Sequence, residues 1–280
     1  MPDDALSAFD RDVKAYYDNA PEESRLSTGT SRLEEARTRE LILRHAPTPP
    51  ARVLDVGGGA GAYSFWLAEL GYDVDLVDAV PRLVDVARAR NERATHKVTS
   101  CSVGDARQLT SAANSADAVL LLGPLYHLVD RDDRLAALRE AARVLRPGGV
   151  LIAAAISRWA STLDGLSREL LRDEEFVHIM ERDLRDGQHR NPTGEIDYFT
   201  TAYFHRPDEL RDEVAGTGLE VEALYGIEGP GWMLGDFDDR WNDDRRREIL
   251  LQVARKLESE DNVIGCSAHL LVVGRKGRKS

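Results

Sequence analysis

The most constraining feature of the sequence is a buried-type strand that runs directly into a series of alternating glycines. Residues 52–56 read Arg-Val-Leu-Asp-Val, and Gly57, Gly59 and Gly61 follow them. Glycine adopts positive φ angles and lets the backbone approach a ligand closely, because it has no Cβ. A helix that starts after such a loop directs its free N–H groups towards the ligand. The segment therefore predicts a strand, a ligand-binding turn and a helix.

The same alternation of strands and helices continues after the glycines. Four more strands are expected, each with turn residues at one end: 72–77, 97–103, 118–122 and 150–156. Helices with apolar faces are expected between them, for example at 81–91. Strand–helix alternation of this kind builds a mostly parallel sheet with helices on both of its faces. The predicted fold class is therefore α/β.

The chain is expected to form one domain, residues 1–280, in which three segments cover the ligand edge of the sheet. Residues 47–156 make the cofactor-binding core, and 1–46 make an N-terminal helical cover with helices at 7–20 and 31–45. Residues 157–206 are polar and contain no clear strand pattern, so a lid insertion is expected there. Residues 207–280 supply the rest of the sheet, strands 219–227 and 267–273, with a helical insertion at 228–260. In that insertion, Ile249, Val253 and Leu257 predict the apolar face of a helix over 239–259.

The glycines by themselves leave two cofactors open. Gly57-x-Gly59-x-x-Ala62, with Asp78 at the end of the next strand, also fits the fingerprint of a dinucleotide site. Asp55 argues against that site, because a carboxylate close to a pyrophosphate is unfavourable, whereas a cofactor with an ammonium group tolerates it. Two further segments favour the cationic cofactor, Gly104-Asp105-Ala106 after the third strand and residues 145–152, Leu-Arg-Pro-Gly-Gly-Val-Leu-Ile.

Together these segments resemble the class I S-adenosylmethionine-dependent methyltransferases. Residues 122–128, Leu-Gly-Pro-Leu-Tyr-His-Leu, are similar to a subgroup of bacterial enzymes that methylate small molecules. The resemblance implies a Rossmann-like, seven-stranded sheet whose last strand is antiparallel, and S-adenosyl-L-methionine as the cofactor. It says little about the methyl acceptor, which is expected to be a small molecule.

The resemblance also implies a cofactor-binding role for individual residues. The loop of Gly57, Gly59 and Gly61 would pass under the methionine part of the cofactor, with Asp55 either close to it or bracing the loop. Asp78, followed by Ala79, would accept hydrogen bonds from both ribose hydroxyls, as a carboxylate does well. The remaining implied contacts are Asp105 and Ala106 with the adenine, and Leu122 and Gly123 with the path to the sulfonium.

Tyr126 and His127 are the candidates for a catalytic role, because they follow the fourth strand, where donor and acceptor meet in this fold. Histidine is the usual proton acceptor near neutral pH, although a single histidine in a loop is often only a structural hydrogen-bonding group. Tyr17 and Arg25 could close over the methionine carboxylate, since arginine pairs with carboxylates through two hydrogen bonds, or could simply end an amphipathic helix.

Charge and composition weigh against several other classes of protein. The formal net charge is −12, and the acidic residues are spread along the chain, so neither a nucleic-acid nor a membrane partner is expected. Two cysteines cannot make a disulfide framework, and no Cys/His set has metal-site spacing, so we expect a cytoplasmic protein without a metal, monomeric or homodimeric. Two alternatives stay open: an NAD(P)-dependent oxidoreductase, and a non-catalytic cofactor-binding protein with a methyltransferase fold.

Overall fold

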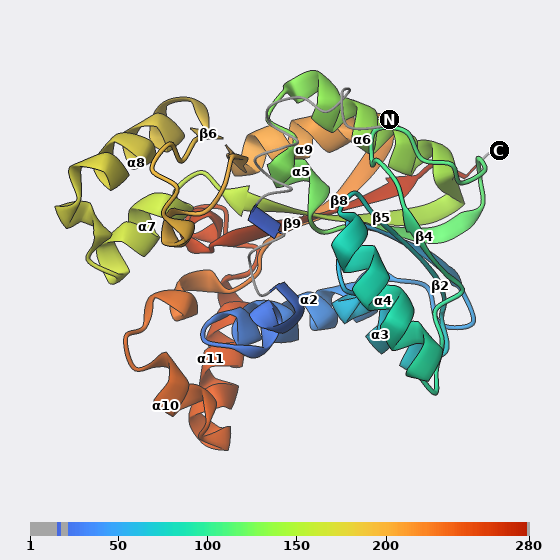
Figure 1. Cartoon of the computed structure of the whole chain (residues 1–280), viewed down its shortest axis with the longest axis horizontal. Coiled ribbons are helices and arrows are strands. Elements are labelled where there is room, and N and C mark those ends of the chain that lie inside the picture. The colour runs from blue at the N-terminus through green and yellow to red at the C-terminus, as the bar shows by residue number, and fades with distance from the viewer. Residues whose placement is uncertain (1–15, 18–21, 279–280) are drawn as a thin grey trace.

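The computed structural model describes residues 16, 17 and 22–278. The predicted helix at 7–20 lies almost entirely outside this part of the chain. A central sheet crosses the molecule, with helices above and below it (Figure 1). No helix among the described residues is both long and apolar enough to cross a bilayer.

The sheet has the predicted mostly parallel core. Its seven core strands follow the order β3-β2-β1-β4-β5-β9-β8, and β9 runs antiparallel to both of its neighbours. Their bounds are β1 (Arg52–Val56), β2 (Asp73–Asp78), β3 (Ser100–Val103), β4 (Ala116–Leu121), β5 (Leu145–Ser157), β8 (Leu219–Gly226) and β9 (His269–Lys276). The predicted α/β class with a final antiparallel strand is confirmed.

Helices cover the two faces of this sheet and bury both. One layer contains α2 (Ser31–His45), α3 (Ala62–Glu69) and α4 (Pro81–Arg93); the other contains α5 (Pro124–His127), α6 (Arg131–Val144) and α9 (Pro207–Ala215) (Figure 1). Neighbouring residues of β1 enter opposite layers: Val53 packs into one apolar cluster and Leu54 into the other. Burial on both faces explains why the central strands β4 and β5 read as continuous apolar runs and not as alternating patterns.

The segment predicted as a lid contains strands that the sequence analysis did not foresee. It forms α7 (Ala160–Ser167), η3 (Leu170–Arg172), α8 (Glu174–Asp186), β6 (Gln188–His189), η4 (Ile196–Tyr198) and β7 (Ala202–His205). β9 pairs with one edge of β5, and β4 pairs with the other edge as far as Ala153. β7 continues on the same edge as β4, where Phe204 pairs with Ile156. The expectation of a segment without strands was wrong, because strands of two and four residues are too short to show an alternating pattern.

The insertion between β8 and β9 also differs from the expected single helix. It forms η5 (Gly229–Met233), α10 (Phe237–Trp241), α11 (Asp244–Leu257) and η6 (Ile264–Cys266). The Asp243 side chain accepts a hydrogen bond from the N–H of Arg246, so it caps α11 and separates it from α10. The face predicted from Ile249 and Val253 is wrong, since these side chains are 52% and 40% exposed, whereas Leu250 and Ala254 are buried.

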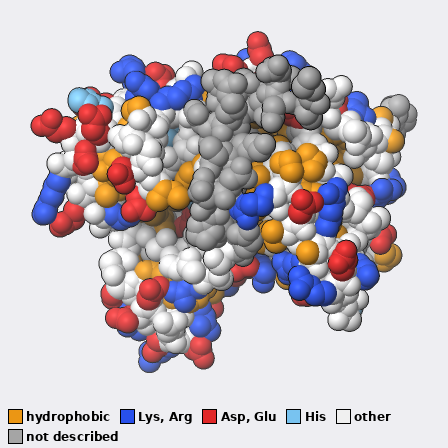
Figure 2. All heavy atoms as spheres, in the orientation of Figure 1, with side chains coloured by type: hydrophobic (Ala, Val, Ile, Leu, Met, Phe, Trp, Pro, Cys, Tyr) orange, Lys and Arg blue, Asp and Glu red, His pale blue; other side chains and the backbone are white. Residues whose placement is uncertain are grey.

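Acidic and basic side chains are interspersed over the face of the molecule shown in Figure 2.

At the N-terminal side, η2 (Glu22–Ser27) leads into α2, which packs against α11 and η5. The edge at which β1, β2, β4 and β5 end carries the candidate site, and its cover by the flanking segments stays a prediction.

Candidate active site

The glycine loop at the end of β1 has the backbone conformation that the sequence predicts. Gly57, Gly59 and Gly61 have φ angles of 75°, 54° and 86°, which side-chain-bearing residues rarely adopt. A Cβ atom on Gly57 would lie 2.5 Å from Cδ of Pro124, the first residue of α5. The loop therefore packs closely against the segment that follows β4.

Asp78 ends β2 and holds the glycine loop in place. One carboxylate oxygen accepts a hydrogen bond from the Gly59 N–H at 2.8 Å, and the other accepts one from the Val80 N–H at 2.8 Å. The side chain is 8% exposed, and this burial raises the pKa of the carboxyl. Each oxygen has a further lone pair that could accept a hydrogen bond from a ligand hydroxyl, and the contact with a ribose stays a prediction. Ala79 next to it is exposed.

Asp55 lies underneath the loop. Its carboxylate accepts a hydrogen bond of 2.6 Å from Oγ of Ser64 in α3, and the side chain is almost fully buried. Burial raises the pKa of this carboxyl to about 6. A Cβ on Gly58 would approach the carboxylate to 2.8 Å, so Asp55 and the loop are in contact. This arrangement favours the bracing role; direct contact with a cofactor stays a prediction.

The two residues predicted to meet the adenine lie just after β3. Asp105 is already paired with Arg107, whose Nη2 donates a hydrogen bond at 2.6 Å and whose backbone N–H donates another at 2.8 Å. Arg107 in turn contacts Asp133 of α6 at 2.8 Å. Ala106 is buried. Asp105 is thus held rigidly at the strand end, and its contact with a base stays a prediction.

The segment after β4 brings together residues that were predicted separately. Leu122 and Gly123 connect β4 to α5, on which Tyr126 and His127 lie. The Tyr17 hydroxyl is 2.7 Å from Nε2 of His127, and the rings of Tyr126 and His127 pack edge to face. Burial lowers the pKa of His127 to about 4, so its ring is neutral at neutral pH.

Arg25 makes a contact that the sequence did not suggest. Its guanidinium donates two hydrogen bonds, of 2.7 and 3.0 Å, to the carboxylate of Glu34 in α2. The predicted contact with a cofactor carboxylate would have to share this pairing, and it stays a prediction.

A cavity of about 200 Å³ begins at Tyr126 and extends under the covering segments. Its wall contains Ile156 at the end of β5, Ala160 and Ser161 of α7, and His269 at the start of β9, so it opens at the carboxyl ends of β4 and β5. Eight of the seventeen lining residues are aromatic: Tyr16, Tyr17, Tyr126, Phe176, Tyr198, Phe199, Phe204 and Trp232. Such a wall suits a small, largely apolar ligand.

Two residues near this cavity were missed by the sequence analysis. Glu228, 2% exposed, accepts a hydrogen bond of 2.5 Å from Nδ1 of His269. They lie 41 positions apart and meet only because β8 and β9 are antiparallel neighbours joined by the helical insertion. No local motif could have revealed the pair.

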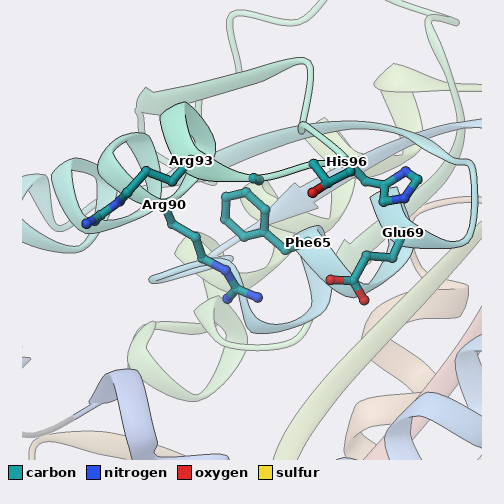
Figure 3. Close-up of a pocket in the computed structure, with 7 residues that line it drawn as sticks. Phe65, Glu69, Arg90, Arg93 and His96 are labelled. Atoms are coloured by element: carbon teal, nitrogen blue, oxygen red, sulfur yellow. The ribbon is translucent and has the colours of Figure 1, made fainter.

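A second, more open groove lies between α3 and α4. It has a volume of about 670 Å³ and is lined by Phe65, Glu69, Arg90, Arg93 and His96, among others (Figure 3). Arg90 stacks over the Phe65 ring at 4.2 Å. The groove is built from helix surfaces and the loop after α4, away from the strand ends that carry Asp78 and Tyr126, so we assign it no part in the reaction.

The fold and the strand-end residues define an α/β protein of the Rossmann-like methyltransferase class. The sequence pattern of the methyltransferase domain family matches residues 54–153. An S-adenosylmethionine-dependent methyltransferase from Mesorhizobium loti superposes with a TM-score of 0.58 and 16% identity, covering 87% of this chain and all of that one. Residues 54–153 are therefore similar to the methyltransferase domain family, the chain has the fold of S-adenosylmethionine-dependent methyltransferases, and S-adenosylmethionine is the expected cofactor.

Two relatives place limits on what similarity alone says. An uncharacterized methyltransferase of Mycobacterium bovis is 41% identical over 105 residues, 38% of this chain and 40% of that protein. A ubiquinone biosynthesis O-methyltransferase of Azorhizobium caulinodans is 28% identical over 197 residues, 68% of this chain and 70% of that protein. The chain thus spans less than half the length of the first of these relatives.

Proposed function

We propose that the protein transfers a methyl group from S-adenosylmethionine to an oxygen or nitrogen atom of a small molecule held in the cavity. One observation carries this proposal. The helix α5 touches the glycine loop through Pro124 at one end, and it contributes Tyr126 to the cavity wall at the other. A cofactor on the loop and a molecule in the cavity would therefore meet at α5.

The residues present fit S-adenosylmethionine. When bound, it supplies a methyl group that is already activated for attack by a nucleophile. The glycine loop and Asp78 would hold its nucleoside and methionine parts, while the aromatic wall orients the acceptor and excludes water. Holding two reactants in line can contribute roughly 7–11 kcal/mol in the best cases. The name of the Azorhizobium relative supports an oxygen acceptor.

The two alternative functions make different predictions about ligands. A nicotinamide oxidoreductase would be stabilised against heat by NAD or NADP, whereas the proposed enzyme would be stabilised by S-adenosylhomocysteine. A non-catalytic protein would bind S-adenosylhomocysteine but transfer no labelled methyl group to any molecule in a metabolite extract. The expected result is stabilisation by S-adenosylhomocysteine alone, together with labelled product.

Asp78 provides the direct test of the cofactor site. We expect Asp78→Asn to weaken the binding of S-adenosylhomocysteine at least tenfold. Hydrogen bonds to a charged acceptor contribute about 1.5–3 kcal/mol, and about 1.4 kcal/mol corresponds to a tenfold change in the dissociation constant. Asp73→Asn is the matched control, since Asp73 is exposed at the opposite end of the same strand. Titration calorimetry that finds equal affinities for the two variants would contradict the assignment.

The subgroup suggested by residues 122–128, the monomeric or homodimeric state and the absence of a nucleic-acid partner stay predictions. Each can be examined on the purified protein: by the acceptor it methylates, by its mass in solution, and by its failure to bind DNA or RNA at physiological salt.

A further inference from the structure

We propose that His269, held in position by Glu228, receives the proton of the acceptor, and that the acceptor is a single-ring phenol methylated on its hydroxyl oxygen. The proposal rests on the proposed function and specifies the substrate class of the same cavity. It replaces the sequence-based candidate His127 by a residue that the cavity wall contains.

The position of the His269 ring is fixed on one side and open on the other. Nδ1 lies 2.5 Å from a Glu228 carboxylate oxygen, and the other oxygen of Glu228 accepts hydrogen bonds from Oγ of Ser267 and from the backbone N–H of His269. Glu228 is almost fully buried, so this carboxylate cannot turn away into water. The ring also lines the cavity, and no described residue hydrogen-bonds to Nε2. A carboxylate that orients one histidine nitrogen so that the other can accept a proton is the arrangement of a general base.

The surrounding charges stabilise a proton on this ring. From α2, a carboxylate oxygen of Glu34 lies 3.9 Å from Nδ1, and from η2, Arg25 neutralises Glu34 in part. Although burial opposes the charged form, Glu34 and Glu228 together raise the pKa of His269 to about 9. Asp164 of α7 and Asp197 of η4 face the same cavity from the opposite wall. A base of this strength matches an acidic hydroxyl such as that of a phenol, because proton transfer is efficient when the two pKa values are close.

His127 is less suited to the same task. Its Nε2 is occupied by the Tyr17 hydroxyl, and His127 is not part of the cavity wall as far as the described residues show. Its lowered pKa of about 4 makes it a weak base. It fits a structural role that joins Tyr17 to α5.

The cavity itself selects the size and chemistry of the acceptor. About 200 Å³ is less than the roughly 300–1,000 Å³ of pockets for drug-sized ligands, so one ring with short substituents fits and a polycyclic molecule does not. Phe176, Phe199 and Phe204 offer stacking surfaces for a ring. Ser161 lines the same wall, is 6% exposed, and its Oγ has no hydrogen-bond partner in the described structure. A second polar substituent on the ring would satisfy it.

The reaction step balances without any further reagent. A lone pair of the phenol oxygen forms the new O–C bond, the C–S bond of the cofactor breaks, and its electron pair stays on sulfur. The phenol proton moves to Nε2 of His269, while Nδ1–H remains bonded to Glu228. This step uses the neutral form of the ring, so a pKa of about 9 predicts that activity rises with pH up to about 9.

The test uses the full chain and two matched sets of acceptors. 4-Hydroxybenzoate and catechol are compared with 4-aminobenzoate and 1,2-diaminobenzene, in assays with labelled S-adenosylmethionine. We expect methylation of the phenols, a loss of about 10²–10³-fold in kcat/KM for His269→Asn, and affinity for S-adenosylhomocysteine within twofold of the wild type. His178→Asn is the control, since His178 is exposed on α8.

Two further measurements separate a chemical role from a structural one. In Glu228→Gln the rising limb of the pH–rate profile should move to lower pH, because loss of the negative charge weakens the hold of His269 on its proton. With S-adenosylhomocysteine present, bound 4-nitrophenol should show the phenolate absorption band in the wild type at pH 6 but not in His269→Asn. Glu228 is in this scheme a positioning residue.

Several outcomes would overturn the inference. Two concern the acceptor: methylation of the anilines in preference to the phenols, and no methylation of either set. Two concern His269→Asn: a kcat/KM within threefold of the wild type, and a loss of affinity for S-adenosylhomocysteine. Glu34, Glu228 and His269 also place ligand atoms within 4.8 Å of one another, so activity that chelators abolish and a divalent ion restores would assign the cluster to a metal instead. A wild type that ignores S-adenosylhomocysteine would refute the proposed function itself.

Discussion

Gly57 meets two constraints that no other residue type could meet together. Its φ angle is 75°, and Pro124 occupies the space where a Cβ would lie. We expect Gly57→Ala to lower the affinity for S-adenosylhomocysteine more than tenfold. It should also reduce Tm by well over roughly 2–4 °C, the shift that 1 kcal/mol of backbone strain causes in a chain of this size. Calorimetry and thermal unfolding measure the two effects.

Gly194 offers a matched control for this substitution. Its φ angle is 79°, but no atom lies within 4 Å of the position of its Cβ. Gly194→Ala should therefore show the strain alone, with unchanged affinity for S-adenosylhomocysteine. Equal effects of the two substitutions would mean that contact with α5 does not matter for the loop.

At the scale of single residues, the sequence predicted the positions of those site residues that belong to a local motif. Gly57, Gly59, Gly61 and Asp78 occupy the strand ends at which they were expected, because a parallel strand, its loop and the next helix are contiguous in the chain. His269 and Glu228 could not be found in this way. Their contact depends on two strands that are joined by a long helical insertion, which no short-range pattern describes.

The position of α5 depends on a buried arginine in α6. Arg134 is 2% exposed; its guanidinium donates hydrogen bonds to the carbonyls of Leu128 and Val129, just after α5, and pairs with Glu213 of α9 at 2.7 Å. Arg134→Met should lower the free energy of unfolding by about 3–5 kcal/mol, because it leaves Glu213 charged and buried without its main partner. Denaturant titration measures the change.

Arg139 lies on the same helix and is exposed, so Arg139→Met controls for the loss of one positive charge. We expect it to stay within about 0.5 kcal/mol of the wild type. If Arg134→Met were equally mild, the junction after α5 would not depend on the buried ion pair.

At the scale of elements, the alternation of strands and helices was sufficient to predict the core strands. It was insufficient to predict the elements in the segments at 157–206 and 228–260. Six of the seven core strands were expected within three residues of their observed bounds, whereas β5 starts at Leu145, five residues earlier than expected, because residues 146–149 were interpreted as a turn. β6 and β7 were missed because their few residues take up strand geometry only through tertiary pairing. The break before α11 was missed because Asp243 acts as a helix cap inside an otherwise helical pattern.

At the scale of the whole molecule, we expect stability to fall at alkaline pH as His269 loses its proton. Its pKa is raised in the folded chain to about 9 from 6.5, so its stabilising effect is complete below pH 6.5 and is lost as the pH rises through 9. The loss should be about 3 kcal/mol, at 1.36 kcal/mol per unit. Denaturant titrations of the free protein at pH 6.5 and 9.5 measure it.

The corresponding variant isolates this effect. His269→Asn should unfold with nearly the same free energy at both pH values, whereas His178→Asn should keep the wild-type decline. A decline that persists in His269→Asn would assign the alkaline loss to other groups.

The pairing of β7 with β5 fixes the segment at 157–206 to the sheet, and this affects how a ligand can reach the cavity. Backbone hydrogen bonds at Ile156 and Ser157 anchor α7 and α8 to the sheet, so that wall of the cavity cannot swing open without breaking strand pairing. The part of the wall formed by Tyr16, Tyr17 and Arg25 is held through side-chain contacts, such as those of Tyr17 with His127 and of Arg25 with Glu34. Because such contacts open more easily than paired strands, we expect small molecules to enter and leave the cavity past these three side chains.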